Sequence, residues 1–496
     1  MEGLVGSRQT DVVALLLLLH VNHFKDAKLP YTQFFNALFG RKSNTMKQHA
    51  KPHNNEIDAL WEQALELHKL SHDEEAQKLY EKLLTIQPHA HAYYNLGTIF
   101  QKQEKLEEAI VMYEKAIALH LEHANVYYNL GVILKEQNRL DEAIVLYEKA
   151  IVLNPNHANS YTNFGNILKD QNRLTEAMTR YEKAIALNPN NTNAQVNKSL
   201  ILLLKGNLLE GFALYEKRWE TLKRNVSKPV WQGDGVSLRG KTLLLYSEQG
   251  LGDTIQFCRY SEQVAQLGCT IILAVEKTLL PLMRQLKGVS HVVERGTALP
   301  PFDYHCSLLS LPFAFKTTLE SIRSLKSYLV ADAQKMEYWS NRLKSQNPKI
   351  GLVWSGSKTY TGDSYRSIPL EELLKYLPGG FEYICLQKEV RQSDQTALDN
   401  SNIRFLGEEL NDFEDTAALC ATMDLVISVD TGVAHLSAAL GKKTFVLLPF
   451  APDWRWMLER NDSPWYPTMR LFRQDAIEDW AGALIELNRS VLDFFS

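Results

Sequence analysis

The sequence predicts an N-terminal α-solenoid followed by a two-lobed α/β domain with doubly wound, Rossmann-like sheets. The solenoid is indicated by tyrosines that recur at an interval of 34 residues, Tyr113, Tyr147, Tyr181 and Tyr215. After about residue 240 the pattern changes to short apolar runs that alternate with helical segments, which is typical of parallel strands joined by helices. The clearest βαβ unit covers residues 425–448 and supports the α/β prediction for the C-terminal half.

Composition sets the broad class. The chain has 496 residues, of which 45% are hydrophobic and 23% charged, and its formal net charge is −4. This length exceeds what a single core usually serves, so roughly two to four domains are expected. The small negative charge gives no electrostatic reason to expect nucleic acid as a partner. Five cysteines without a C-x-x-C pair predict reduced thiols and a cytoplasmic protein: Cys258, Cys269, Cys306, Cys385 and Cys420.

Residues 1–55 are predicted to be an apolar leader followed by a polar linker. The apolar run Val12–Leu19 is shorter than the about 20 residues that a membrane-spanning helix needs. It also lacks the basic start and the small-residue cleavage site of a secretory signal. We therefore expect no membrane span, and the leader is assigned no function.

Residues 56–225 are predicted to form five repeats, at 57–89, 90–123, 124–157, 158–191 and 192–225. Glycines at the same interval, Gly97, Gly131 and Gly165, would let the two helices of each repeat approach closely. The period and the segments YYNLG and EEAIVMYEKAIAL resemble the tetratricopeptide repeat. Such an array is expected to bind a protein or an extended peptide. Tyr93, Tyr127 and Tyr161 stand at the same position of three successive repeats. For these tyrosines, packing between helices is favoured over peptide contact.

Two α/β lobes are expected after a linker at residues 226–240. The first lobe is predicted at 241–335 and the second at 349–475, with a cleft between them and a closing helix at 476–496. The first lobe is expected to contain a helix at 254–267. Strands are predicted at 241–247, 270–275, near Val292 and Tyr304, and at 349–355, 381–387, 403–406, 425–429 and 443–448.

The stretch DLVISVDTGVAHLSAALGKKTFVLLP, residues 424–449, points to a phosphate site. A helix is expected to begin just after the strand at 425–429, and the N–H groups and dipole of a helix N-terminus favour an anion. Thr431, Gly432 and His435 would then lie beside a nucleotide phosphate. The alternative is that Asp430 or Thr431 only caps the helix, and this stretch leaves both interpretations open.

A second motif, EQGLGDT at 248–254, lies at the carboxyl end of the first predicted strand. Gly250 and Gly252 would let the backbone approach a ligand closely, and Asp253 stands at the start of the next helix. The motif is neither a dinucleotide fingerprint nor a Walker loop, because G-x-G-x-x-G and Gly-Lys-Ser/Thr are both absent from it. Since the two motifs fall in different lobes, Asp253 is expected to face the stretch Asp430–His435.

GLGD followed by an apolar helix, together with VDTGVAHLSAALGK, resembles the heptosyltransferase-type glycosyltransferases of family nine. The resemblance covers about residues 240–475 and implies the two-lobed GT-B fold. It also implies that Asp253 is the general base for an acceptor hydroxyl, and that Asp430, Thr431, Gly432 and His435 hold the donor diphosphate. Lys358 and Arg366 are both candidates for a nearby cation. The chain contains no D-x-D motif, so no metal and no cofactor are expected beyond the nucleotide sugar as co-substrate.

The resemblance therefore predicts an inverting, metal-independent glycosyltransferase whose repeats recruit the acceptor, with a protein as one candidate acceptor. Two rival functions stay open. One is a non-catalytic scaffold whose GT-B domain binds only a nucleotide sugar or a partner, in which case Asp253 is a capping carboxylate. The other is an enzyme that acts on nucleotides without glycosyl transfer.

The segment between residues 452 and 467 is predicted to be a loop. Its indoles, Trp454, Trp456 and Trp465, are expected either to stack against a sugar or to pack against the closing helix. Asp453 and Arg455 are interpreted as a structural pair rather than as catalytic residues.

Overall fold

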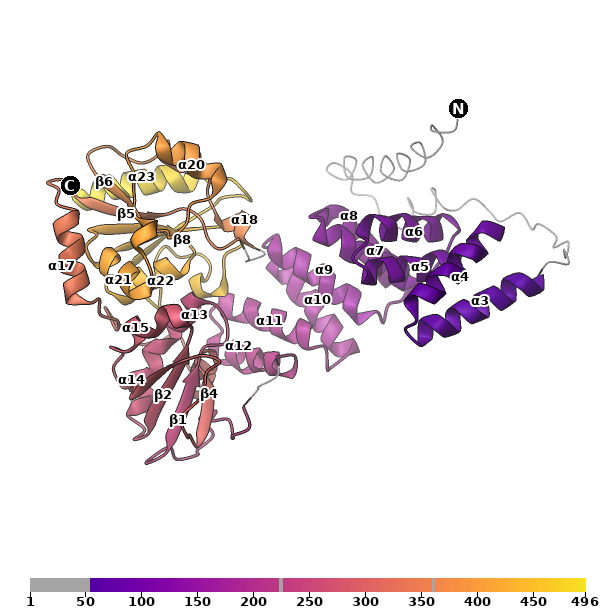
Figure 1. The fold of residues 1–496 in the computed structure, drawn as a ribbon, viewed down its shortest axis with the longest axis horizontal. Helices are drawn as coiled ribbons and strands as arrows, with labels where there is room; N and C mark the ends of the chain where they lie inside the picture. The colour runs from indigo at the N-terminus through magenta and orange to yellow at the C-terminus, as the bar shows by residue number, and fades with distance from the viewer. Residues whose placement is uncertain (1–53, 223–225, 359–361) are drawn as a thin grey trace. The chain divides into compact units, whose positions relative to one another are not determined.

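The computed structural model describes residues 54–222, 226–358 and 362–496 (Figure 1). Nearly all of the predicted leader therefore lies outside the described residues. The chain divides into two compact units, and the division falls within the repeats. Described residues up to 167, together with 179–189, form the first unit, while residues 168–178 and 190–496 form the second. The last predicted repeat thus belongs to the same unit as both α/β lobes.

Ten helices between residues 54 and 215 follow one another as five helix–turn–helix segments, which confirms the predicted α-solenoid. They are α3 (Asn54–Lys69) and α4 (Asp73–Ile86), α5 (Ala90–Lys102) and α6 (Leu106–Ala118), α7 (Ala124–Glu136) and α8 (Leu140–Leu153), α9 (Ala158–Asp170) and α10 (Leu174–Leu187), and α11 (Thr192–Leu204) and α12 (Leu208–Tyr215). A short 3-10 helix, η1 (Glu216–Glu220), continues directly from α12.

The repeating glycines lie where the two helices of a repeat come closest. A Cβ atom added to Gly97 would lie 2.7 Å from the ring of Tyr113, and one added to Gly131 would lie 2.8 Å from the ring of Tyr147. Both tyrosine side chains are fully buried. The 34-residue interval therefore places a small residue against a large aromatic ring, and this allows the close approach of the two helices that the sequence predicted.

Replacing Gly131 with alanine should destabilise the first unit by about 1–3 kcal/mol, because the added methyl group overlaps the buried ring of Tyr147. Amide hydrogen exchange in α7 and α8 measures this loss. Gly379→Ala is the control, since Gly379 has open space around it. Equal protection of α7 in the two variants would contradict the packing argument.

The first lobe contains a four-stranded parallel sheet in the order β3-β2-β1-β4. Its strands are β1 (Thr242–Tyr246), β2 (Thr270–Val275), β3 (His291–Glu294) and β4 (Tyr304–Ser307), and its α-helices are α13 (Leu251–Phe257), α14 (Ser261–Ala265), α15 (Leu280–Met283) and α16 (Leu311–Ala314). Part of the predicted linker lies along this sheet, because the Trp231 N–H donates a hydrogen bond to the His305 carbonyl over 2.8 Å.

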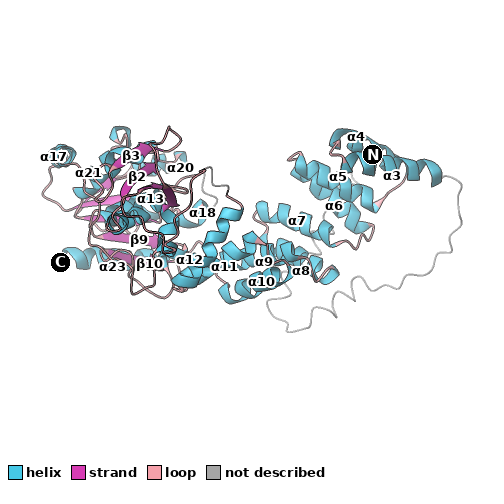
Figure 2. Ribbon diagram, turned by 90° about the horizontal axis from the view of Figure 1, so that it is seen from below, coloured by secondary structure: helices cyan, strands magenta, loops and turns pink. Residues whose placement is uncertain are grey.

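The second lobe contains a six-stranded parallel sheet in the order β10-β9-β8-β5-β6-β7. Its strands are β5 (Lys349–Val353), β6 (Glu382–Cys385), β7 (Arg404–Phe405), β8 (Leu425–Val429), β9 (Thr444–Leu448) and β10 (Met469–Arg473). Helices surround the strands of both sheets (Figure 2). In the second lobe they are α17 (Ala333–Arg342), α18 (Asp363–Arg366), α19 (Leu370–Leu374), α20 (Gln392–Asp399), α21 (Phe413–Ala421), α22 (Gly432–Ala439) and α23 (Ala481–Phe495).

Two local predictions were wrong in their bounds, and one strand was missed. The helix predicted at 254–267 begins earlier, at Leu251, and breaks into α13, a 3-10 turn and α14. The closing helix begins at Ala481 rather than at residue 476. The strand β10 was not predicted at all, because Arg470 and Arg473 interrupt the apolar run of this edge strand.

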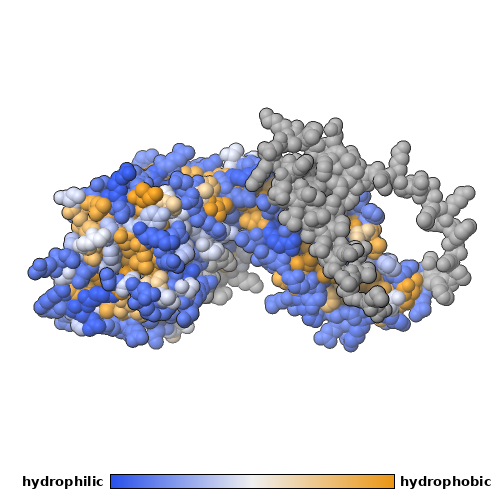
Figure 3. Space-filling view, turned by 90° about the horizontal axis from the view of Figure 1, so that it is seen from above, coloured by the Kyte–Doolittle hydropathy of each residue, from blue (hydrophilic) through white to orange (hydrophobic). Residues whose placement is uncertain are grey.

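Among the described residues, no helix combines the length and the apolar character that crossing a membrane would require. The face shown in Figure 3 is mostly hydrophilic, with apolar residues in small groups between the polar ones.

Candidate active site

In the second sheet, the order in which strands are added reverses between β5 and β8. From β5 the chain builds β6 and β7 on one side, and it then crosses to build β8, β9 and β10 on the other. In open parallel sheets, ligands bind outside the carboxyl ends of the strands at such a switch point. Here those ends carry the loop that begins at Trp354 and the segment Asp430–Gly432. The phosphate motif of the sequence therefore lies at the switch point.

The N-terminus of α22 lacks a side-chain cap. Thr431 occupies the N-cap position with an extended backbone, but its side chain makes no capping hydrogen bond. Its hydroxyl lies instead 3.0 Å from the Ser428 hydroxyl. The structure thus argues against a capping role for the Thr431 side chain. The N–H groups at the start of α22 receive no hydrogen bond acceptor from this side chain.

Of the two candidate cations, Arg366 lies at the switch point. Its Nη1 donates to the Asp430 carbonyl over 2.7 Å, and its Nε donates to Asp363 over 3.1 Å. The lack of a side chain at Gly356 makes room for the guanidinium, since a Cβ there would lie 2.3 Å from Nη2. Lys358 is exposed and borders the undescribed residues 359–361.

Asp253 has two roles at once in the first lobe. It is the third residue of α13, and its Oδ2 accepts the Gly250 N–H over 2.9 Å, which forms a helix cap. Its Oδ1 accepts a hydrogen bond from Arg455, a residue of the second lobe. The carboxylate therefore faces the second lobe through Arg455, while it also caps its own helix.

Two glycines bring the helix ends of the two lobes together. A Cβ added to Gly252 would lie 2.9 Å from the His435 ring and 3.5 Å from the Gly432 Cα. Only glycine at position 252 permits this approach without displacement of His435. The N-termini of α13 and α22 are therefore in direct contact, and Asp253 stands next to the predicted phosphate site.

Arg455 sits between two carboxylates. It pairs with Asp253 and, over 2.7 Å, with Asp453, while only 9% of its side chain is exposed. Burial raises the pKa of Asp253, and the positive charge of Arg455 opposes that rise. Burial, with repulsion from Asp453, raises the pKa of Asp430 to about 6. Asp430 therefore changes its charge close to neutral pH.

His435 lies inside the protein in this arrangement. Its Nδ1 is 2.9 Å from the Tyr466 hydroxyl, and its ring stacks on Trp456 at a centroid distance of 5.1 Å. Burial, with nearby Arg455, lowers the pKa of His435 well below its usual value, so the imidazole is neutral at pH 7. It contributes no positive charge to a phosphate site, and it packs α22 against Trp456 and Tyr466.

The three tryptophans of the 452–467 segment pack in the interior. Trp456 and Trp465 are fully buried, and Trp454 is 4% exposed. Trp454 lies edge-on to Trp465 and stacks on Phe257 of α13. Of the two expected roles, packing is the one that the structure has, although Trp454 and Trp465 pack on Phe257 of the first lobe and Trp456 on His435 of α22, rather than on the closing helix.

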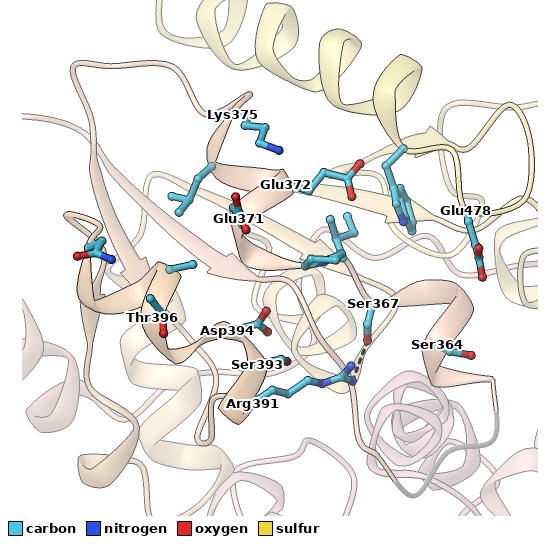
Figure 4. A pocket seen from close by; sticks show the side chains of 16 residues that line it. Ser364, Ser367, Glu371, Glu372, Lys375, Arg391, Ser393, Asp394, Thr396 and Glu478 are labelled. Atoms are coloured by element: carbon cyan, nitrogen blue, oxygen red, sulfur yellow. Dashed lines mark hydrogen bonds between the residues drawn. The ribbon is translucent and has the colours of Figure 1, made fainter.

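A cavity of about 930 Å³ lies elsewhere in the second lobe (Figure 4). Residues of α19 and α20 line it, with Arg391 and Ser367 at one side, where Arg391 Nη2 donates to the Ser367 hydroxyl over 3.0 Å. None of the predicted site residues lines this cavity. Within the described parts of the chain, no group of three or more His, Cys, Asp or Glu side chains is placed to hold a metal ion.

Known family models match part of the repeat region and part of the α/β region. Residues 89–153, 122–190 and 162–221 match models of the tetratricopeptide repeat. Residues 377–449 match the model of glycosyltransferase family 9 (heptosyltransferase). This chain joins tetratricopeptide repeats to a heptosyltransferase-like domain. The matched part of that domain includes Asp430–His435 but not the loop that carries Asp253.

Similar proteins include Protein FlbA of Caulobacter vibrioides (strain ATCC 19089 / CIP 103742 / CB 15), which is 27% identical over 301 residues. The alignment covers 54% of this chain and 49% of FlbA, so the chain spans about half the length of this relative. Among solved structures, YrrB, described as a TPR protein with an unusual peptide-binding site, is 25% identical, with a TM-score of 0.31 over 35% of this chain and 90% of its own. MamA is 23% identical, with a TM-score of 0.30 over 32% of this chain and 94% of its own.

Sequence reasoning missed Arg455 as the partner of Asp253. It paired Arg455 only with Asp453, two residues away, and that contact is present as well. The contact with Asp253 joins residues 202 positions apart. An arginine between two tryptophans, in a segment that follows a buried strand, was the available signal.

Proposed function

We propose that this protein is a glycosyltransferase that moves a sugar from a nucleotide-sugar donor to a hydroxyl acceptor. The main support is the contact between α13 and α22, which brings the Asp253 carboxylate beside an uncapped helix N-terminus at the switch point of the second sheet. The match to glycosyltransferase family 9 supports the same activity. The repeats would recruit the acceptor, for which a protein is our candidate, and five free cysteines favour a cytoplasmic location.

In the proposed mechanism, Asp253 takes the proton of the acceptor hydroxyl as that oxygen attacks the anomeric carbon. The bond between this carbon and the diphosphate oxygen breaks, and its electron pair leaves with the nucleoside diphosphate. Attack from the face opposite the leaving group inverts the anomeric configuration. The α22 N-terminus and Arg366 would stabilise the negative charge on the leaving group without a metal ion.

One observation favours a second candidate, a non-catalytic scaffold. Both oxygens of Asp253 already have partners, the Gly250 N–H and Arg455, as expected of a purely structural carboxylate. For catalysis, an acceptor hydroxyl would have to share or replace the hydrogen bond with Arg455.

The proposed function is tested with the full chain and a panel of nucleotide sugars. A true donor should raise the melting temperature of the protein, because ligand binding to the folded state stabilises it. The same donor should then release its nucleoside diphosphate faster when an acceptor is present. Stabilisation without turnover would support the scaffold, and release that no acceptor accelerates would indicate an enzyme that acts on nucleotides alone.

Binding of the donor should strengthen as the pH falls from 7 to 5. Asp430, with a pKa of about 6, is ionised above this value and neutral below it, so acid removes a negative charge beside the donor diphosphate. The phosphates of a nucleotide sugar stay ionised throughout this range. We expect a gain of up to roughly tenfold in affinity, equivalent to about 1.4 kcal/mol. Calorimetric titration at both pH values measures it, and Asp430→Asn should flatten the profile. The same pH slope in that variant would exclude Asp430 as the cause.

A further inference from the structure

The last repeat contacts the loop that precedes Asp253. Arg218, in η1, is 4% exposed and makes two hydrogen bonds to the Glu248 carboxylate, of 2.6 and 3.1 Å. The same guanidinium also binds Glu216 over 2.6 Å and the Ser310 hydroxyl over 2.9 Å. A paired arginine and carboxylate fix orientation as well as distance. The position of Glu248 is therefore set by a residue of the repeats.

The neighbouring residue of the loop is held by the same repeat. The Gln249 side-chain amide donates to the Tyr215 hydroxyl over 2.8 Å, and Tyr215 ends α12. The next residue, Gly250, donates its N–H to Asp253. Three consecutive residues of the loop thus form a continuous set of contacts from the last repeat to the proposed base.

The last repeat also contacts the segment that carries the partner of Asp253. Phe212 of α12 lies edge-on to Trp454, with ring centroids 5.5 Å apart. The guanidinium of the next residue, Arg455, lies 4.4 Å from the centroid of the Trp454 ring. One repeat therefore contacts both segments that meet at the ion pair between Asp253 and Arg455.

Stability alone does not explain the pair of Arg218 and Glu248. Removing two charged groups from water is costly, and apolar residues of similar size often stabilise a buried position as well or better. What a buried pair of this geometry supplies in addition is a defined orientation of the loop. That orientation matters at a site where a small displacement of the base slows the reaction.

We propose that Arg218 and Tyr215 are positioning residues, which hold the loop 248–250 so that Asp253 is correctly oriented for proton transfer. The last repeat then helps to orient the catalytic residue, in addition to any role in acceptor recruitment. This inference rests on the proposed function for its kinetic consequence, but the ordering of the loop is a separate physical property that is measurable without activity.

The test uses three variants of the full chain. Arg218→Lys keeps the charge but loses the paired hydrogen bonds. Tyr215→Phe removes only the hydroxyl that binds Gln249, so it serves if the first variant folds poorly. Lys217→Gln is the matched control, because Lys217 is the adjacent residue and forms only an exposed pair with Glu220.

Hydrogen exchange is the first measurement. In Arg218→Lys and Tyr215→Phe, the amides of residues 248–257 should exchange several-fold faster than in the wild type, while those of β2 stay unchanged. In Lys217→Gln both regions should match the wild type. Unchanged exchange in the loop, or equal acceleration in β2, would overturn the proposal, since the latter indicates general destabilisation.

Kinetics are the second measurement. Both positioning variants should lower kcat by about 10- to 100-fold, as a misplaced catalytic group does, while the KM for the donor stays the same. A higher KM with an unchanged kcat would contradict positioning. If the wild type transfers no sugar, the proposed function fails, whereas the exchange comparison still decides whether the repeat orders the loop.

Discussion

Replacing Asp253 with asparagine should lower kcat for sugar transfer by about 10²–10⁴-fold, the usual contribution of a general base. An amide oxygen can still accept the Gly250 N–H, so the helix cap is retained, but an amide cannot take the proton of the acceptor. Steady-state kinetics at saturating donor and acceptor measure the loss. Thermal unfolding of the same preparation shows whether the variant is folded.

Asp462→Asn is the control for this experiment. It makes the same chemical change at an aspartate that also pairs with an arginine, Arg460, but whose side chain is 65% exposed. We expect its activity to equal that of the wild type. Turnover by Asp253→Asn at the wild-type rate would exclude Asp253 as the base.

Replacing Arg455 with methionine should destabilise the second unit by about 3–5 kcal/mol, because removing one partner leaves a buried charge uncompensated. Asp253 and Asp453 both lose their cation. Urea unfolding followed by tryptophan fluorescence measures the change. Arg460→Met removes an arginine from a pair with an exposed aspartate, and it should cost about 1 kcal/mol or less.

The deficit of Arg455→Met should depend on pH in a defined direction. Without Arg455, the pKa of Asp253 in the folded state rises further above its unfolded value, since the opposing charge is gone. A raised carboxyl pKa lowers stability as the pH rises through it. The variant should therefore be closer to the wild type at pH 5 than at pH 8. Adding Asp253→Asn should restore part of the lost stability. A stability deficit that depends neither on pH nor on the added Asp253→Asn would contradict the charge argument.

Fully buried strands were predictable from the sequence. The strand Leu425–Val429 was predicted with its observed bounds, because all five residues are apolar or small and all are buried. The solenoid was predictable for a related reason, since three successive repeats contain the same packing of glycine against tyrosine. The edge strand β10 was missed because only part of it faces the core, and its two arginines resemble those of a loop.

In the candidate site, too, local features were predictable from the sequence and long-range contacts were not. Gly432 and Thr431 could be placed from sequence, because a strand, a turn and a helix follow one another locally. The contact of Gly252 with His435, and that of Asp253 with Arg455, join segments about 200 residues apart, and no local pattern records such a distance. The burial of His435 depends on Tyr466 and Trp456, which belong to a segment without regular periodicity.

The contact between Arg218 and Glu248 changes where the chain can be divided. The change of pattern near residue 240 looks like a natural place to begin a shorter protein that contains only the sheets. Such a cut would remove Arg218 and leave Glu248, whose side chain is 6% exposed, without its cation. A cut near residue 190, where the second unit resumes, would retain α11, α12 and η1 with the lobes. The border of the repeat pattern in the sequence and the border of the compact unit therefore differ, and a shortened protein should follow the second.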